Sequence, residues 1–353
     1  MAERHQPRSV LVTGGAGFIG CNFVGGILEN DPNIRVLTLD ALTYAGHRVS
    51  LAEVEARYGD RHVFLEGDIR DRKLLADIFA EYRIDTVVHF AAESHVDRSI
   101  DGPLDFIETN VLGTACLLEA TRFVWKERGN IRFHHVSTDE VFGSLDQEGF
   151  FREDTPYDPS SPYSASKAAS DHLVRAWART YGMDITISNC SNNYGPYQFP
   201  EKLIPLMIRN AVEGKKLPVY GDGSNVRDWL FVPDHCRAIE LIIRKGRSGS
   251  TYNIGGHNEM TNLEVVQILC DIVDEFIPEE GSRRDLISFV RDRPGHDQRY
   301  AIDASRIEEE LGWRPSVDFT EGLRRTVRWY LENEEWCREV MKENYGGERL
   351  GKA

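Results

Sequence analysis

The chain of 353 residues is 41% hydrophobic and 28% charged, a composition typical of a globular protein with one large core or two smaller ones. Its formal net charge of −15 argues against nucleic acid or an anionic membrane as a partner, because both surfaces repel an acidic protein. The six scattered cysteines lack the C-x-x-C spacing of zinc sites and the pattern of disulfide scaffolds, so no metal is expected.

No apolar run approaches the ~18 residues of a membrane span, and the first residues of the chain are polar. Together with the scattered cysteines, this favours a reducing, cytoplasmic location.

Short apolar runs alternate with longer amphipathic segments along the first half of the chain. The runs at 10–13, 34–40, 62–68, 85–92, 131–138 and 184–191 have the composition of buried strands, and helical segments such as 104–126 lie between them. This alternation predicts an α/β fold, a doubly wound parallel sheet of the Rossmann type.

The first predicted strand runs directly into a glycine-rich turn with the sequence GGAGFIG, residues 14–20. Glycine allows a sharp turn and a close approach, and the helix that follows presents free N–H groups to a pyrophosphate. Asp40 ends the second strand about 20 residues later, where its carboxylate would accept hydrogen bonds from an adenosine ribose. A carboxylate there disfavours a 2′-phosphate, so NAD is preferred over NADP; an ordinary glycine-rich turn is the alternative.

Two further strand ends belong to the same predicted site, because ligands of such sheets bind at the carboxyl ends of the strands. Asp68 and Ile69 follow the third strand and would flank the adenine. Ala91, Ala92 and Ser94 follow the fourth strand and would lie along the nicotinamide half.

A helix is predicted to begin after Ser161, which can cap it, and to end at Gly182. Tyr163 and Lys167 are four residues apart in this helix and therefore share a face. An ammonium beside a phenol favours the phenolate and lowers its pKa, which makes tyrosine a usable base. The alternative is a surface helix with an exposed lysine.

The predicted fifth strand ends in Ser137-Thr138-Asp139-Glu140, a hydroxyl group followed by two carboxyl groups. Two carboxyl groups can serve as acid and base in one site if their surroundings separate their pKa values. Residue types alone do not say which is the acid, and a solvated turn after a strand is the alternative.

The G-x-x-G-x-x-G turn and Y-x-x-x-K resemble the extended short-chain dehydrogenase/reductase superfamily. More narrowly, the chain resembles nucleoside-diphosphate-sugar 4,6-dehydratases, above all those that act on dTDP-glucose. Matching stretches run nearly end to end and include AAESHVDRS (91–99), STDEV (137–141), NCSNNYGPYQFPEKLIP (189–205), YNIGGHN (252–258) and RPGHD (293–297). Departures from the family pattern are peripheral: Cys21 replaces a common serine, and His47-Arg48 a more usual Asn-Leu pair.

The resemblance implies a three-step conversion of dTDP-glucose to dTDP-4-keto-6-deoxyglucose and water, with NAD tightly bound and regenerated in each turnover. Tyr163, helped by Thr138 and Lys167, would take the proton of the C4 hydroxyl. Glu140 would abstract the C5 proton as general base, and Asp139 would protonate the leaving C6 hydroxyl as general acid.

The resemblance also implies the binding residues. For the cofactor they are Gly14, Gly17, Phe18, Ile19, Gly20, Asp40, Leu42, Thr43, Asp68, Ile69, Ala91, Ala92, Ser94, Thr109, Tyr163, Lys167 and Asn193. For the substrate they are Ser94, His95, Thr138, Asn192, Lys202, Leu203, Pro218, Tyr220, Arg227, Asn262, Arg293 and His296. For the substrate residues ordinary loop positions are the alternative, and His95 could equally be a satisfied interior histidine.

After residue 190 the alternation ends, and proline and glycine become more frequent. We expect an NAD-binding domain at 1–190, to which 226–250 returns, and a smaller, mostly helical sugar-nucleotide domain at 191–225 and 251–353. The segments 104–126 and 165–180 are apolar on more than one face, which calls for a second packing partner. In the family they form a four-helix dimer interface, so a homodimer is expected.

Two other functions remain open at this point. A related 4-epimerase or decarboxylase would share Tyr163 and Lys167 but does not require Asp139-Glu140. A non-catalytic NAD-binding sensor would not need the tyrosine and lysine, and both are present. The nucleobase, the sugar and the downstream pathway are not readable from these residues.

Overall fold

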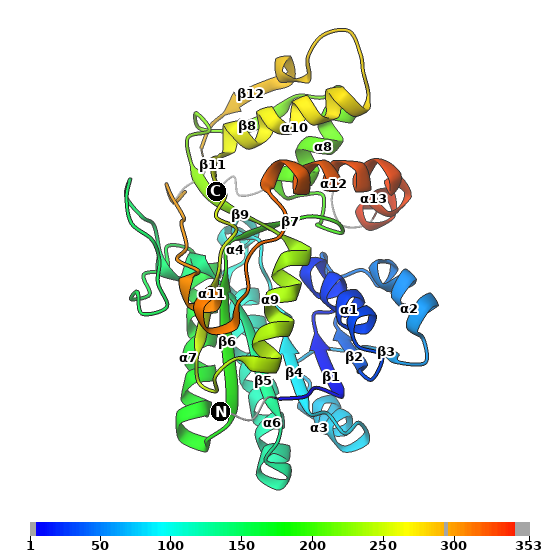
Figure 1. Cartoon of the computed structure of the whole chain (residues 1–353), viewed down its shortest axis with the longest axis vertical. Helices are drawn as coiled ribbons and strands as arrows, with labels where there is room; N and C mark the ends of the chain where they lie inside the picture. The colour runs from blue at the N-terminus through cyan, green and yellow to red at the C-terminus, as the bar shows by residue number, and fades with distance from the viewer. Residues whose placement is uncertain (1–4, 293–295, 343–353) are drawn as a thin grey trace.

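The computed structural model describes residues 5–292 and 296–342, which form a larger and a smaller lobe (Figure 1). The larger lobe contains a seven-stranded parallel sheet within the described residues, in the order β10-β6-β5-β4-β1-β2-β3. Six of its strands are those predicted from the sequence, and the α/β class is confirmed. They are β1 (Ser9–Thr13), β2 (Arg35–Asp40), β3 (His62–Glu66), β4 (Thr86–His89), β5 (Arg132–Thr138) and β6 (Asp184–Cys190).

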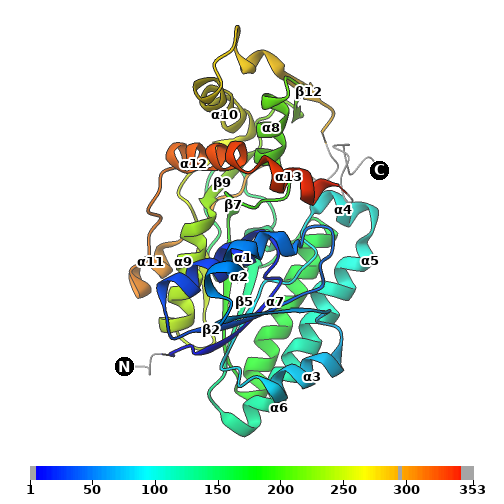
Figure 2. The ribbon, with the colours of Figure 1, turned by 90° about the vertical axis from the view of Figure 1, so that its right-hand side faces the viewer.

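Alternate residues of the central strands enter two separate cores. Val10 and Val12 of β1 pack with α1 (Phe18–Asn30) and α9 (Val232–Lys245) on one face, whereas Leu11 packs with helices on the other. Those helices are α3 (Arg72–Glu81), α6 (Thr114–Arg128) and α7 (Pro162–Tyr181), and Figure 2 shows them from the side. A sheet covered on both faces explains why its strands read as nearly continuous apolar runs.

The long helix predicted at 104–126 is present but not uniform. It begins as α5 (Pro103–Phe106), widens into a π-helical segment (Ile107–Gly113) and continues as α6. A π-helical segment inside an α-helix is common beside functional sites, and Thr109 of this segment lines the cavity described below.

Both ends of α7 follow the predicted signals. The Ser161 hydroxyl accepts a hydrogen bond from the Ser164 amide at 3.1 Å, and Pro162 occupies the first turn. Gly182 ends the helix in the left-handed conformation at φ 68°. These caps set where Tyr163 and Lys167 stand relative to the sheet.

The smaller lobe has its own core around Tyr194, Trp229 and Phe319. The helices that supply this core are α8 (Leu203–Val212), α10 (Asn262–Phe276), α12 (Phe319–Glu332) and α13 (Glu334–Met341). Two small sheets complete the lobe, formed by β7 (Asn192–Tyr194), β9 (Val226–Phe231) and β11 (Glu259–Thr261), and by β8 (Leu217–Tyr220) and β12 (Ile287–Val290).

Within the segment 226–254, the chain passes between the lobes at points other than the predicted domain boundaries. β9 pairs with β7 and β11 in the smaller lobe, whereas α9 packs on α1. β10 (Thr251–Ile254), placed in the sugar-nucleotide domain by the sequence, pairs with β6 as the edge of the large sheet. Its four residues follow a Gly-Ser turn, too short a pattern to separate from a loop.

Short elements complete the described chain. They are the 3₁₀ turns Arg48–Leu51, Asp139–Phe142 and Arg283–Leu286, and the helices α2 (Ala52–Tyr58), α4 (Val96–Asp101) and α11 (Ser305–Leu311). Across the described ranges, no helix combines the length and the apolar character that crossing a membrane demands.

Candidate active site

A cavity of about 780 Å³ opens at the carboxyl ends of β1, β4 and β5, between the two lobes. β1 and β4 are neighbours at the point where the strand order reverses, which is the usual ligand position in doubly wound sheets. The cavity is lined from the glycine turn at Gly14 to Lys202 at the start of α8. One hollow therefore reaches from the predicted cofactor turn to the second lobe.

The glycine turn is built for close backbone approach. Gly14 has φ 72°, and a Cβ on it would lie 2.6 Å from the Ala91 amide nitrogen. A Cβ on Gly20 would lie 2.2 Å from the Gly14 carbonyl oxygen. α1 begins at Phe18, and its N-cap residue Gly17 has no side chain to cap it, so no side chain occupies the first N–H groups of the helix, as a pyrophosphate site requires.

Asp40 stands at the end of β2 and lines the cavity beside Thr43. Its carboxylate accepts hydrogen bonds of 2.9 Å from the amides of Ala16 and Leu42. Burial raises the pKa of Asp40, and these two amides oppose the shift. Leu42 does not line the cavity; it adopts φ 50° and packs against the core.

The glycine turn yields a direct test of cofactor binding. We expect Gly20→Ala to lower stability by about 1–3 kcal/mol and to empty the purified protein of NAD, because its Cβ meets two backbone groups. Gly26→Ala in the same helix is the control: nothing lies within 4 Å of its Cβ, so it should gain about 0.5–1 kcal/mol and keep the cofactor. Thermal melting and absorbance after denaturation measure both effects, and full cofactor content in Gly20→Ala would contradict the assignment.

Tyr163 and Lys167 lie side by side in the buried part of α7 and line the cavity. Lys167 Nζ donates a 2.9 Å hydrogen bond to the Val136 carbonyl of β5. Burial raises the pKa of the Tyr163 phenol well above its ordinary value, and the charge of Glu140 raises it further. Burial thus outweighs the pKa-lowering influence that the sequence predicted from the neighbouring ammonium.

Thr138, Asp139 and Glu140 lie where β5 ends and a 3₁₀ turn begins, and all three line the cavity. The Thr138 hydroxyl lies 3.3 Å from Asp139 Oδ1 and accepts a 3.2 Å hydrogen bond from the Glu140 amide. Asp139 is 1% exposed, and burial together with the neighbouring Glu140 raises the pKa of its carboxyl group well above the ordinary value. Both effects favour the protonated form of Asp139.

The structure brings most of the predicted residues to this one cavity. Those that line it are Gly14, Gly17, Phe18, Ile19, Gly20, Asp40, Thr43, Asp68, Ile69, Ala91, Ala92, Ser94, Thr109, Thr138, Asp139, Glu140, Tyr163, Lys167, Asn192, Asn193 and Lys202. Besides lining the cavity, Lys202 donates a 3.3 Å hydrogen bond to the Ser94 carbonyl.

Other predicted substrate residues lie outside the cavity lining. Leu203 opens α8, Asn262 opens α10, and Pro218 and Tyr220 belong to β8. His95 is buried, with Nε2 3.7 Å from Glu201 Oε1. A role of His95 beside the sugar or cofactor stays a prediction.

Arg227 and His296 are held by protein groups near the cavity. The Arg227 guanidinium donates to the carbonyls of Val226, Asp297 and Gln298. His296 Nδ1 lies 2.7 Å from Asp292 Oδ1. Arg293 lies outside the described residues.

The sequence did not single out three groups around this site. Tyr300 lies beneath Arg227, with the guanidinium carbon 4.2 Å from its ring centre, and the charge of Glu140 acts on its phenol. Asp228 is buried, and its charge raises the pKa of the Asp139 carboxyl group. Asp171 lies one turn beyond Lys167. Only Asp171 has a readable signal, a spacing of four residues from a predicted catalytic lysine.

Comparison with known proteins extends over nearly the whole chain. The model of the GDP-mannose 4,6 dehydratase family matches residues 11–326. A dTDP-glucose 4,6-dehydratase of Xanthomonas campestris pv. campestris is 56% identical over 348 residues, which cover 97% of this chain and 98% of the relative. The chain belongs to the dTDP-glucose 4,6-dehydratase family.

Other members agree with that assignment. The dTDP-glucose 4,6-dehydratase of Escherichia coli is 54% identical over 95% of this chain and 96% of its own length. A dTDP-glucose 4,6-dehydratase from Streptomyces venezuelae, solved with NAD bound, is 51% identical and superposes with a TM-score of 0.86 over 94% of this chain and 99% of its own. This dTDP-glucose 4,6-dehydratase family member thus shares both lobes with its relatives.

Proposed function

We propose that the protein converts dTDP-glucose to dTDP-4-keto-6-deoxyglucose and water with NAD as its cofactor. The observation that carries the proposal is the meeting of two sets of groups in one cavity. Tyr163 and Lys167 supply an oxidation site, and Asp139 with Glu140 supply an elimination site beside it. Relatives at 54% and 56% identity carry the same activity in their names.

The glycine turn, the uncapped start of α1 and Asp40 fit the pyrophosphate and adenosine ribose of NAD. NAD held there would supply a hydride acceptor for C4 of the sugar and, later in the turnover, a hydride donor for C6. The role of Tyr163 is to take the proton of the C4 hydroxyl as the hydride leaves. Lys167, one turn further along α7, and Thr138, whose hydrogen bond lowers the pKa of the phenol, would stabilise the phenolate that must exist before this step.

Elimination across C5 and C6 follows from the C4 ketone, which acidifies the C5 proton. Glu140 removes that proton, and Asp139 donates its own proton to the leaving C6 hydroxyl. The raised pKa of Asp139 fits this acid role, because the carboxyl group must hold a proton until the oxygen leaves. Glu140 then returns a proton to C5 as the hydride reaches C6.

The proton balance links the two sets of groups. After one turnover Tyr163 has gained a proton and Asp139 has lost one, so a proton must pass from the phenol to the carboxylate or through solvent. The Thr138 hydroxyl forms hydrogen bonds with both groups. Thr138 is therefore placed to reset the site as well as to assist the C4 step.

The alternative functions are less consistent with the site. A 4-epimerase has no need for a buried, protonated Asp139 beside Glu140, and a non-catalytic sensor has no need for either pair. Incubating the protein separately with dTDP-glucose, UDP-glucose and GDP-mannose tests the proposal. We expect a base-labile 4-keto product that has lost one water from dTDP-glucose alone; a C4-epimerised product, or no product, would overturn it.

A homodimer is part of the proposal and follows from exposed apolar side chains. Four of them lie on the segment from α5 to α6 and are 46–73% exposed: Leu104, Ile107, Leu112 and Phe123. A run of this kind on one helical segment calls for a covering partner, and a second copy of the chain is the partner expected in the family.

A cytoplasmic location stays a prediction.

Light scattering measures the assembly directly. We expect twice the 40.2 kDa mass of one chain, and a shift toward 40.2 kDa in the double variant Leu104→Glu/Leu112→Glu, because two buried charges lack partners. Phe289→Glu is the control, since Phe289 is 59% exposed on β12 in the other lobe. A wild-type protein that scatters as one chain at micromolar concentration would rule the dimer out.

A further inference from the structure

Four residues of α7 follow one another at intervals of four along a single face: Tyr163, Lys167, Asp171 and Arg175. The first two belong to the proposed active site. Asp171 and Arg175 do not line that cavity, yet they continue the same line with alternating charge. The Asp171 side chain is wholly buried, and so is most of Lys167, which is 4% exposed.

Asp171 is held by groups from three directions. Its Oδ2 accepts hydrogen bonds from the Ser137 hydroxyl at 2.9 Å and from the Tyr157 hydroxyl at 2.7 Å. Its Oδ1 lies 3.2 Å from His135 Nε2. Ser137 directly precedes Thr138, so the carboxylate is tied to the same strand end that carries the acid–base residues.

The imidazole beside the Asp171 carboxylate does not balance its negative charge. Burial lowers the pKa of His135 to about 4, so this imidazole is neutral near pH 7 and does not offset a buried negative charge. Burial would raise the pKa of Asp171, but His135, Lys167 and Tyr157 together bring it below the ordinary value, so it stays ionised. Lys167 is the buried cation available to it.

The buried Lys167 ammonium in turn needs a negative counter-charge. Burial lowers the pKa of its ammonium, and Asp171 is the foremost group that opposes the shift, followed by Cys190 of β6. The other titratable groups around it are Tyr163 on its own helix, His135 on β5 and His89 on β4. The two imidazoles are neutral near pH 7 and give the ammonium no negative counter-charge.

We propose that Asp171 is a positioning residue for the reaction: its buried carboxylate is the counter-charge that keeps Lys167 an ammonium, and through it supports the Tyr163 phenolate. The inference rests on the proposed roles of Tyr163 and Lys167. Asp171 touches neither substrate nor cofactor, so its effect passes through Lys167.

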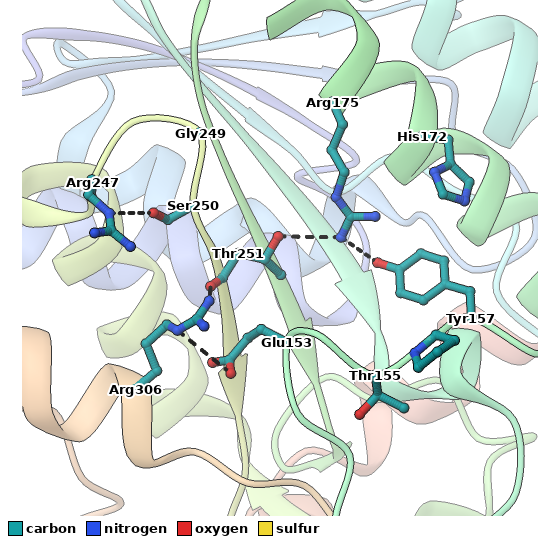
Figure 3. Close-up of a pocket in the computed structure, with 11 residues that line it drawn as sticks. Glu153, Thr155, Tyr157, His172, Arg175, Arg247, Gly249, Ser250, Thr251 and Arg306 are labelled. Carbon is teal, nitrogen blue, oxygen red and sulfur yellow. Dashed lines mark hydrogen bonds and ion pairs between the residues drawn. The ribbon is translucent and has the colours of Figure 1, made fainter. Parts of the chain in front are cut away.

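The outer end of this line reaches a second cavity of about 460 Å³, shown in Figure 3. There the Arg175 guanidinium donates to the Tyr157 hydroxyl at 2.7 Å and to the Thr251 hydroxyl at 3.3 Å (Figure 3). Arg175 thus orients the phenol that donates to Asp171. Tyr157→Phe removes this support while leaving both buried charges in place.

The test is the pH profile of C4 oxidation, followed as reduced cofactor in single turnovers with dTDP-glucose. Asp171→Asn should move the alkaline limb of kcat to lower pH by about 1–3 units, because an uncompensated buried ammonium loses its proton sooner. KM should stay within about twofold, since Asp171 makes no substrate contact. Tyr157→Phe leaves the Asp171 charge in place and should leave this limb where the wild type has it.

Asp234→Asn is the matched control. Asp234 is also a buried carboxylate, which accepts hydrogen bonds from Ser316 and Val317 and does not line the active-site cavity. It should lower the melting temperature without moving the pH profile. An Asp171→Asn protein that folds and keeps the wild-type pH profile would overturn the inference. The proposed function is judged separately, by whether the unmutated protein converts dTDP-glucose. If Asp171→Asn fails to fold, Asp171→Ser, which is smaller and also uncharged, decides, and an unshifted limb in that variant overturns the inference.

Discussion

Tyr163→Phe should slow oxidation at C4 by about 10²–10⁴-fold, because in the proposed mechanism the buried phenol takes the C4 hydroxyl proton. Tyr163 is 8% exposed and lines the same cavity as Lys167 and the carboxyl pair. Removing one oxygen leaves its ring packed against Phe106, whose centre lies 6.2 Å away. The variant should therefore fold and retain NAD, and its lost rate should reflect chemistry.

Rapid mixing with dTDP-glucose, followed by the absorbance of reduced cofactor, measures this step. Tyr181→Phe at the end of the same helix is the control, because Tyr181 is 42% exposed and distant from the cavity lining. It should react like the wild type. If Tyr163→Phe retained more than a tenth of the wild-type rate, another group would have to be the base.

Glu140→Gln should separate oxidation from elimination. Without a base at C5, we expect dehydration to fall by about 10²–10⁴-fold while hydride transfer from C4 remains detectable. Gln keeps the shape of Glu and does not disturb the 3.2 Å hydrogen bond from the residue 140 amide to Thr138. In deuterated water, exchange of the C5 proton should disappear from the sugar.

Glu148→Gln, at an exposed position of the loop that follows, is the control and should behave as wild type. Exchange at C5 that proceeds unchanged in Glu140→Gln would refute the base role. Loss of C4 oxidation together with exchange would show that Glu140 serves the first step as well.

Most strands of the larger lobe could be predicted from the sequence, because each depends on a short local pattern of apolar residues. Each predicted strand is a short run rich in apolar residues, and each one appears in the sheet within a few residues of its predicted ends. β10 was missed because four residues beside a turn carry too little pattern, and their strand character comes from pairing with β6. The π-helical segment inside the predicted long helix also has no sequence signature.

The site likewise combines features that the sequence predicts and features that depend on segments distant in the chain. Glycines with strict steric needs, such as Gly14 and Gly20, and the helical spacing of Tyr163 and Lys167 are local features. The surroundings of Asp139 are not, because its raised pKa arises from burial among segments distant in sequence, including Asp228. The same limit applies to Tyr163, because its spacing from Lys167 shows a neighbouring charge but not the depth of burial that raises its pKa.

The central claim is that one site oxidises C4, removes water and reduces C6 with the same hydride. dTDP-glucose carrying deuterium at C4 tests this most directly, with the product read by mass spectrometry and NMR. We predict that the deuterium appears in the C6 methyl group of a 4-keto product within single molecules. A product that keeps its C6 hydroxyl, or that loses the deuterium to solvent, would contradict the account.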